Sequence, residues 1–124
     1  MNETQQHATL VDLIEKQLDD QKAKDIEVID LQGAAQFADT MIVASGTSTR
    51  HVASLARGLH DKVKEELDQK PLGVEGLDTA EWVLVDFGDT IVHIMLPATR
   101  SHYELEKLWK ARPEPRPESS NDPA

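Results

Sequence analysis

The chain has 124 residues and no cysteine, which fits a single domain and excludes disulfide, thiol and zinc-thiolate chemistry. Its formal net charge of −10 argues against binding to bare nucleic acid, because that affinity comes mainly from Lys and Arg on phosphates. The charge favours a basic protein partner, or it simply keeps the protein soluble. With no membrane-length apolar run and no signal peptide at the start, we expect a cytoplasmic protein.

The first half of the chain alternates helical and extended patterns. Apolar residues recur on one helical face over residues 6–20, and residues 25–31 and 40–44 are rich in β-branched side chains. A second amphipathic helix is expected to begin at Thr49 and to end near Pro71. Residues 73–75, between glycines, are predicted to form a short edge strand.

Residues 82–96 are predicted to form a β-hairpin. The stretch is mostly apolar, and Gly88-Asp89 is its single turn signal. A two-residue loop at this position sets the register, so that Trp82 faces Met95 and Val85 faces Val92.

Because side chains alternate along a strand, this register predicts two different surfaces. One is core, and it consists of Val83, Val85, Phe87, Val92, Ile94 and Leu96. The other is apolar with three polar groups, and it consists of Trp82, Leu84, Asp86, Ile91, His93 and Met95. We predict that the second surface binds a partner if it is exposed. Alternatively, the last helix covers it fully, or covers part of it and leaves Tyr103 beside the exposed remainder.

The last helix is predicted to begin at a capping box formed by Ser101 and Glu104. Its apolar face would present Leu105, Leu108 and Trp109. Residues 111–124 contain four of the six prolines, and we expect them to form a disordered tail after a domain of residues 1–110. The order of elements predicts an α/β fold with a mixed sheet of about five strands and helices mainly on one face.

The turn Gly46-Thr47-Ser48, between a strand and a helix, is a weak candidate for anion binding. It lacks the sequence of a P-loop or of a dinucleotide-binding turn, so a simple helix cap is the stronger interpretation. Arg50 lies in the first helical turn, where a positive charge opposes the helix dipole. We expect Arg50 to reach Asp39, Asp86 or Asp89, or else to be solvated.

Metal and catalytic sites are not supported by the sequence. No two histidines have the spacing of metal ligands, and His7 and His102 stand alone near the starts of elements. Asp86 and Asp89 flank a turn, where aspartates usually bind the backbone. We therefore predict no catalytic residues, no metal and no cofactor.

Five blocks of sequence, taken together, are similar to those of the ribosomal silencing factor family, also called the Iojap family. They are Asp39 to His51 (DTMIVASGTSTRH), Gly73 to Gly76 (GVEG), Trp82 to Asp89 (WVLVDFGD), Val92 to Met95 (VHIM) and Tyr103 to Trp109 (YELEKLW). The resemblance extends over residues 8–110 and leaves out the proline-rich tail.

This resemblance implies a protein that binds the large ribosomal subunit through large-subunit protein fourteen. It implies that the bound protein blocks subunit joining, represses translation when nutrients run short, and is a homodimer when free. It further implies a sheet similar to the nucleotidyltransferase fold, without known enzymatic activity. Little direct contact with nucleic acid and no membrane contact are expected. The predicted partner-binding residues come from the second surface of the hairpin and from Tyr103 beside it, and not from the resemblance: Trp82, Leu84, Asp86, His93, Met95 and Tyr103.

Two other functions are also compatible with the sequence. An adaptor in assembly of the large subunit would use the same surface, and the sequence does not separate it from a silencing factor. A nucleotidyltransferase-like enzyme would need two carboxylates on the strand after Gly46-Thr47-Ser48, to hold Mg²⁺. The next strand candidate offers only Glu75, which weighs against catalysis.

Overall fold

The computed structural model describes residues 3–31 and 38–104. Helices and strands follow one another in the predicted order: α1 (Glu3–Asp20), β1 (Lys24–Asp30), β2 (Thr40–Ser45), α2 (Thr49–Leu67), β3 (Gly73–Glu75), β4 (Trp82–Asp86), β5 (Thr90–Met95) and α3 (Pro97–Tyr103). No helix among the described residues is both long enough and apolar enough to cross a membrane.

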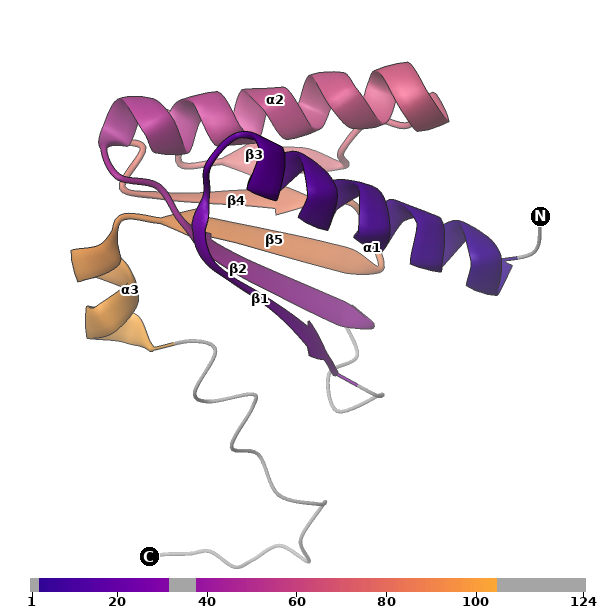
Figure 1. Cartoon of the computed structure of the whole chain (residues 1–124), viewed down its shortest axis with the longest axis horizontal. Helices are drawn as coiled ribbons and strands as arrows, with labels where there is room; N and C mark the ends of the chain where they lie inside the picture. The colour runs from indigo at the N-terminus through magenta and orange to yellow at the C-terminus, as the bar shows by residue number, and fades with distance from the viewer. Residues whose placement is uncertain (1–2, 32–37, 105–124) are drawn as a thin grey trace, which may run out of the picture.

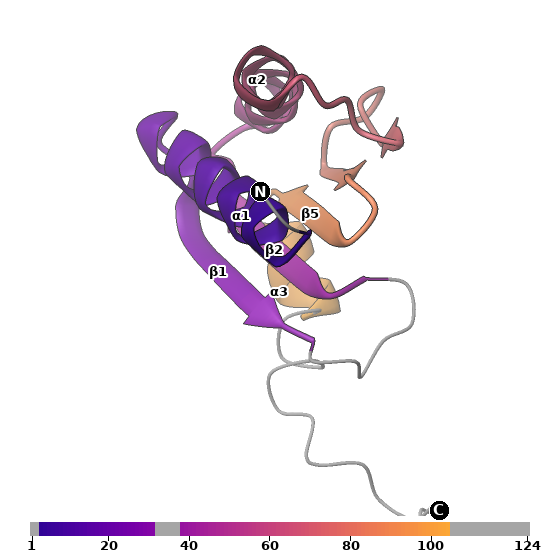
Figure 2. The same ribbon diagram turned by 90° about the vertical axis from the view of Figure 1, so that its right-hand side faces the viewer.

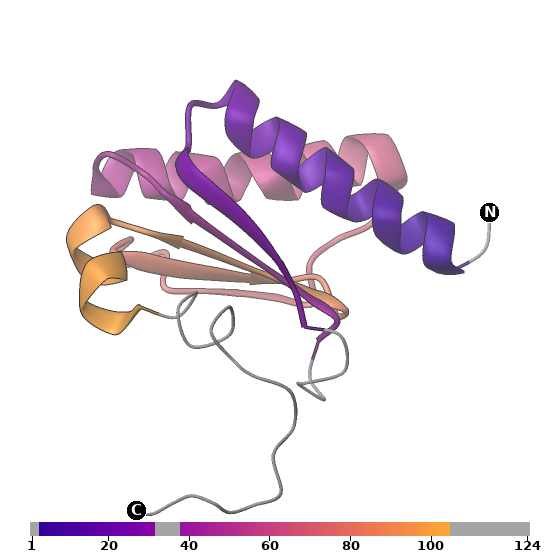
Figure 3. The ribbon, with the colours of Figure 1, turned by 60° about the horizontal axis from the view of Figure 1, so that its bottom comes forward.

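The strands form one mixed five-stranded sheet in the order β1-β2-β5-β4-β3. β2 and β5 are parallel, and the other neighbouring strands are antiparallel. α1 and α2 lie together over one face of the sheet, while α3 lies beyond its end (Figures 1 and 3). The predicted α/β class, the mixed sheet and the placement of helices mainly on one face are confirmed.

The hairpin of β4 and β5 has the predicted register. Trp82 pairs with Met95, and Val85 pairs with Val92. Gly88 has a φ of 98°, a conformation that a residue with a Cβ rarely adopts, and its N–H donates to Asp86 Oδ1 at 2.8 Å. The glycine and the aspartate of this turn thus hold the two strands in register.

The core lies between the sheet and the two long helices. Val83, Val85, Val92 and Ile94 of the hairpin are fully buried there, against the apolar stripes of α1 and α2. Phe87 and Leu96 pack at the margin of the same cluster. The predicted core face of the hairpin is therefore confirmed.

The predicted start of the last helix is wrong. α3 begins at Pro97, and Glu104 forms its C-cap in a left-handed conformation with a φ of 52°, so Ser101 and Glu104 do not form a capping box. Proline is favourable in the first turn of a helix, where its missing N–H has no partner to lose, so it ends β5 and begins α3 without an intervening loop. Leu105, Leu108, Trp109 and the predicted tail lie outside the described residues.

Candidate partner-binding surface

The sheet face opposite α1 and α2 carries a second apolar cluster. Its buried members come from the three strands β1, β2 and β5 and from the residues next to them: Ile29, Leu31, Ala38, Met41, Val43, Ile91 and Met95. Trp82 and Leu84 of β4 pack against this cluster and are only partly buried. The face is thus covered toward its centre and accessible along β4.

The predicted binding residues divide between these two zones. Met95 has no exposed surface and His93 is 7% exposed, and all six residues of β5 are buried. Trp82, Leu84 and Asp86 are half-buried, and Tyr103 of α3 is 54% exposed. Tyr103 thus lies beside a half-buried part of this face, whereas Leu105, Leu108 and Trp109, through which the last helix was expected to cover it, lie outside the described residues.

Trp82 is the centre of the accessible zone. Its ring centroid lies 4.8 Å from that of Tyr103 and 5.8 Å from that of His93, both in tilted arrangements. Its indole Nε1–H donates to His93 Nδ1 at 2.9 Å. The buried histidine therefore orients the tryptophan ring, and the tryptophan supports the tyrosine.

His93 is neutral at ordinary pH. Burial lowers its pKa to about 4, because an imidazolium loses its hydration in the apolar cluster. An indole nitrogen can only donate a hydrogen bond, so Nδ1 is the acceptor and the imidazole proton lies on Nε2. His93 therefore orients the ring of Trp82 and does not make a charged contact.

Three carboxylates lie on the elements that carry this aromatic pair or on a neighbouring strand. Asp86 lies on the same face of β4, Glu75 of β3 is the cross-strand partner of Leu84, and Glu104 follows Tyr103. Accessible aromatic side chains together with carboxylates on neighbouring strands are suited to a basic protein surface.

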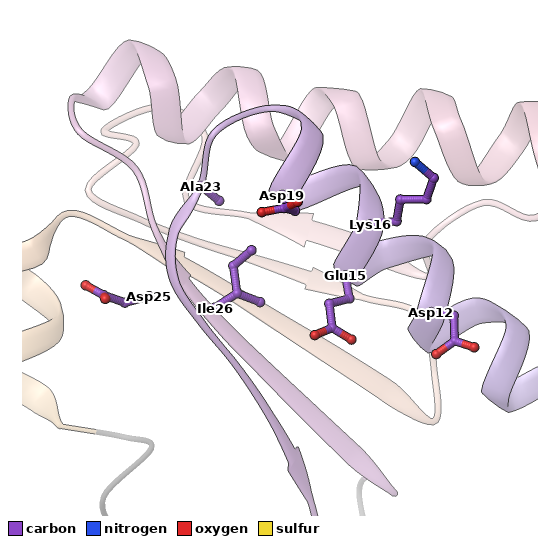
Figure 4. A pocket seen from close by; sticks show the side chains of 7 residues that line it. All are labelled: Asp12, Glu15, Lys16, Asp19, Ala23, Asp25 and Ile26. Atoms are coloured by element: carbon purple, nitrogen blue, oxygen red, sulfur yellow. The ribbon is translucent and has the colours of Figure 1, made fainter.

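A second acidic surface lies between α1 and β1. It is an open groove of about 540 Å³ in which Asp12, Glu15 and Asp19 project from α1, and Asp25 and Ile26 lie on β1 (Figure 4). Its Lys16 pairs with Asp20 at 3.1 Å, so carboxylates set the charge of the groove. The groove adds to the negative field of the molecule on a side away from β4.

The turn Gly46-Thr47-Ser48 caps the start of α2. This confirms the helix cap, which the sequence favoured over an anion-binding turn. Ser48 Oγ accepts from His51 N at 3.1 Å, Thr47 N donates to His51 Nδ1 at 2.9 Å, and His51 Nε2 donates to Gln21 O at 2.9 Å. The side chains of the turn thus use backbone donors that an anion would need. A Cβ on Gly46 would lie 2.7 Å from Val52 Cγ2, so glycine is required by the close approach of turn and helix.

Arg50 does not reach the carboxylates suggested for it. It is exposed and makes no ion pair within the described part of the chain. Because β2 and β5 are parallel, Asp39 and Asp89 lie at the starts of these strands, whereas Arg50 follows the end of β2. The solvated alternative is therefore the correct one.

The comparisons with known proteins agree with this fold. Residues 4–124 match the family described as ribosomal silencing factor during starvation, a match that includes the tail left out of the sequence resemblance. The chain belongs to the ribosomal silencing factor family.

Relatives of this family are similar over most of the chain. A ribosomal silencing factor of Zymomonas mobilis is 42% identical over 100 residues, which cover 81% of this chain and 74% of that protein. A mouse protein named mitochondrial assembly of ribosomal large subunit protein 1 is 38% identical over 107 residues, 82% of this chain and 46% of that protein. A crystal structure of a protein from Chromobacterium violaceum matches with a TM-score of 0.80 at 38% identity, covering 90% of this chain and 92% of that one.

Proposed function

We propose that this silencing factor binds the large ribosomal subunit through large-subunit protein fourteen and blocks subunit joining. By steric exclusion it represses translation under nutrient limitation, in the cytoplasm and without catalysis or a cofactor. Membership of the family supports a role in ribosome silencing or large-subunit assembly.

The observation that carries the proposal is the pairing of Trp82 with Tyr103 at an exposed margin of the sheet. Trp and Tyr are enriched among the residues that dominate binding energy in protein interfaces. In this protein a partly buried hydrogen bond from Trp82 to His93 orients the pair, and the carboxylates Glu75, Asp86 and Glu104 lie on the same or neighbouring elements. We propose that Trp82, Leu84, Asp86 and Tyr103 contact the partner, with His93 and Met95 supporting them from beneath.

The net charge indicates which ribosomal component is contacted. At −10 the protein is repelled by ribosomal RNA and attracted to a basic ribosomal protein. The exposed acidic groups would speed association and make it sensitive to salt.

Assembly of the large subunit is the second candidate function. It is favoured by the mouse relative, whose name states assembly of the mitochondrial large subunit. The same surface would serve both functions, so the two are separated by the particle that is bound. A silencing factor binds the mature subunit, whereas an assembly adaptor binds its precursors preferentially.

We further propose that the free protein forms a homodimer. The half-buried Trp82 and Leu84 lie beside the exposed Tyr103 and would be shielded from water in a dimer. Light scattering on the free protein and on Tyr103→Ala tests this, because loss of the tyrosine should shift the population toward monomer.

Sedimentation tests the main proposal. Tagged protein is mixed with purified large or small subunits, at low and at physiological salt, and the small subunit is then added as a competitor. We expect co-sedimentation with the large subunit only, weaker at higher salt, and a loss of joined ribosomes when the protein is bound first. Co-sedimentation with the small subunit, or unchanged joining at saturation, would overturn the proposal.

A further inference from the structure

Three side chains with metal-ligand chemistry converge at the end of the sheet opposite α3. They are His7 of α1, Asp39 before β2 and Asp89 in the hairpin turn, and their ligand atoms all lie within 4.8 Å of one another. Figure 2 views this end of the molecule, with the start of α1 in front of β2 and β5. The cluster contains none of the residues proposed to contact the ribosomal partner.

Backbone contacts bring the two aspartates together. Asp39 N and Thr40 N both donate to Asp89 O, at 2.8 and 3.1 Å, which ties the start of β2 to the hairpin turn. α1 is anchored over this end by Leu10, which is 3% exposed in the core one turn after His7. The sheet and α1 together thus bring the three side chains close to one another, and no single loop contains all of them.

The imidazole of His7 is arranged as a metal ligand would be. Its Nε2 lies 2.9 Å from Thr40 Oγ1, an oxygen that can accept the ring N–H. A ligating histidine commonly donates its other ring N–H to such an oxygen, which leaves the first nitrogen free to bind the ion.

The other nitrogen, Nδ1, is shielded from solvent and has no hydrogen-bond partner within the described part of the chain. Asp89 Oδ2 lies 3.1 Å from it without the alignment of a hydrogen bond. Two ligand atoms that share one cation are separated by about this distance. A hollow of about 380 Å³, lined in part by His7, Asp89 and Phe87, opens beside the pair and leaves room for water on the ion.

We propose that His7 Nδ1 and the carboxylates of Asp39 and Asp89 bind one divalent transition-metal ion, for which Zn²⁺ is the probe. An imidazole with two carboxylates suits Zn²⁺ and its first-row neighbours, whereas Mg²⁺ prefers an all-oxygen set. The two carboxylates balance the charge of the ion. The bound ion joins α1 to the starts of β2 and β5.

The test is calorimetric titration and thermal melting of the full chain after treatment with a chelator. We expect one Zn²⁺ per chain, a higher Tm with Zn²⁺ present, and no comparable effect of Mg²⁺. His7→Ala and Asp39→Asn should weaken Zn²⁺ binding by about tenfold or more. Asp39 is exposed, so Asp39→Asn should leave the Tm of the metal-free protein unchanged and separate ligand loss from misfolding.

His60 and Asp61 provide the matched control. They form an exposed histidine–aspartate pair on α2 at 3.2 Å, and no third ligand joins them in the described structure. His60→Ala should leave Zn²⁺ binding unchanged. Binding that survives both His7→Ala and Asp39→Asn, binding lost equally in His60→Ala, or no binding at all would overturn the proposal and leave His7–Asp89 as a simple ion pair.

Discussion

Trp82 is oriented by its hydrogen bond to His93, and its ring is only half-buried. Its truncation should therefore weaken partner binding more than it weakens the fold. We expect Trp82→Ala to weaken binding to the large subunit by about 2 kcal/mol or more, as the loss of an interface hot spot does. Sedimentation or interferometry with purified subunits measures the change. Tyr103→Ala should weaken binding as well, with little loss of stability because Tyr103 is 54% exposed.

Val85 is the control for that variant, because it lies on the opposite face of the same strand and is fully buried. Val85→Ala should lower the free energy of unfolding by about 2 kcal/mol and leave the affinity of the folded protein unchanged. If Trp82→Ala instead unfolds the domain while Tyr103→Ala binds normally, the binding surface is elsewhere.

His93 should make stability depend on pH below neutrality. Burial lowers its pKa from 6.5 to about 4, so between these values the unfolded chain binds a proton that the folded protein does not. Stability from this group is present above pH 6.5 and is lost as the pH falls toward 4, by up to roughly 3 kcal/mol. Protonation of His93 would also place an N–H at Nδ1, where it would face the indole N–H of Trp82 and remove the acceptor of their hydrogen bond.

His93→Gln is the variant that isolates this effect, because glutamine offers Trp82 an acceptor and does not titrate. Chemical denaturation of both proteins from pH 7 to pH 4 should show a steeper loss for the native sequence. Parallel curves would mean that His93 is not the group responsible, since the other histidines contribute equally to both proteins.

At the scale of elements, the side chain of Ser48 caps the start of α2. We expect Ser48→Ala to destabilise the protein by about 1 kcal/mol, because His51 N loses the acceptor that caps the helix. Thermal melting measures the change. Ser54→Ala, at an exposed position within the same helix, should be neutral or slightly stabilising. Equal effects of the two substitutions would contradict the capping role.

At the scale of the whole molecule, the sequence predicts that residues 111–124 add little to folding. They contain four of the six prolines and few apolar side chains. A chain ending at Lys110 should melt within about 1 °C of the full protein, since a loss of about 1 kcal/mol would lower the Tm by roughly 2–8 °C. A drop in that larger range would show that these residues are packed.

Local patterns in the sequence determined most of the fold. Gly88-Asp89 set the register of the hairpin, because a two-residue turn allows one pairing and the side chains then alternate. The three- and four-residue spacing of apolar side chains placed α1 and α2, and the sequence indicated a cap at Thr47 or Ser48, of which the structure has Ser48. The last helix was misplaced because Ser101 and Glu104 fit a cap by spacing alone, while Pro97 had already begun the helix.

Only the tertiary structure decided which residues are neighbours across the sheet. Strand order is not written in any local pattern, so the sequence could not show that β5 lies between β2 and β4 and that His93 and Met95 are buried. The same parallel pairing of β2 with β5 kept Arg50 away from Asp39 and Asp89 and brought these two aspartates together, and α1 adds His7 to them. The sequence determined which surfaces exist, because periodicity is local; the fold decided which are covered and which side chains meet, because these depend on contacts between distant segments.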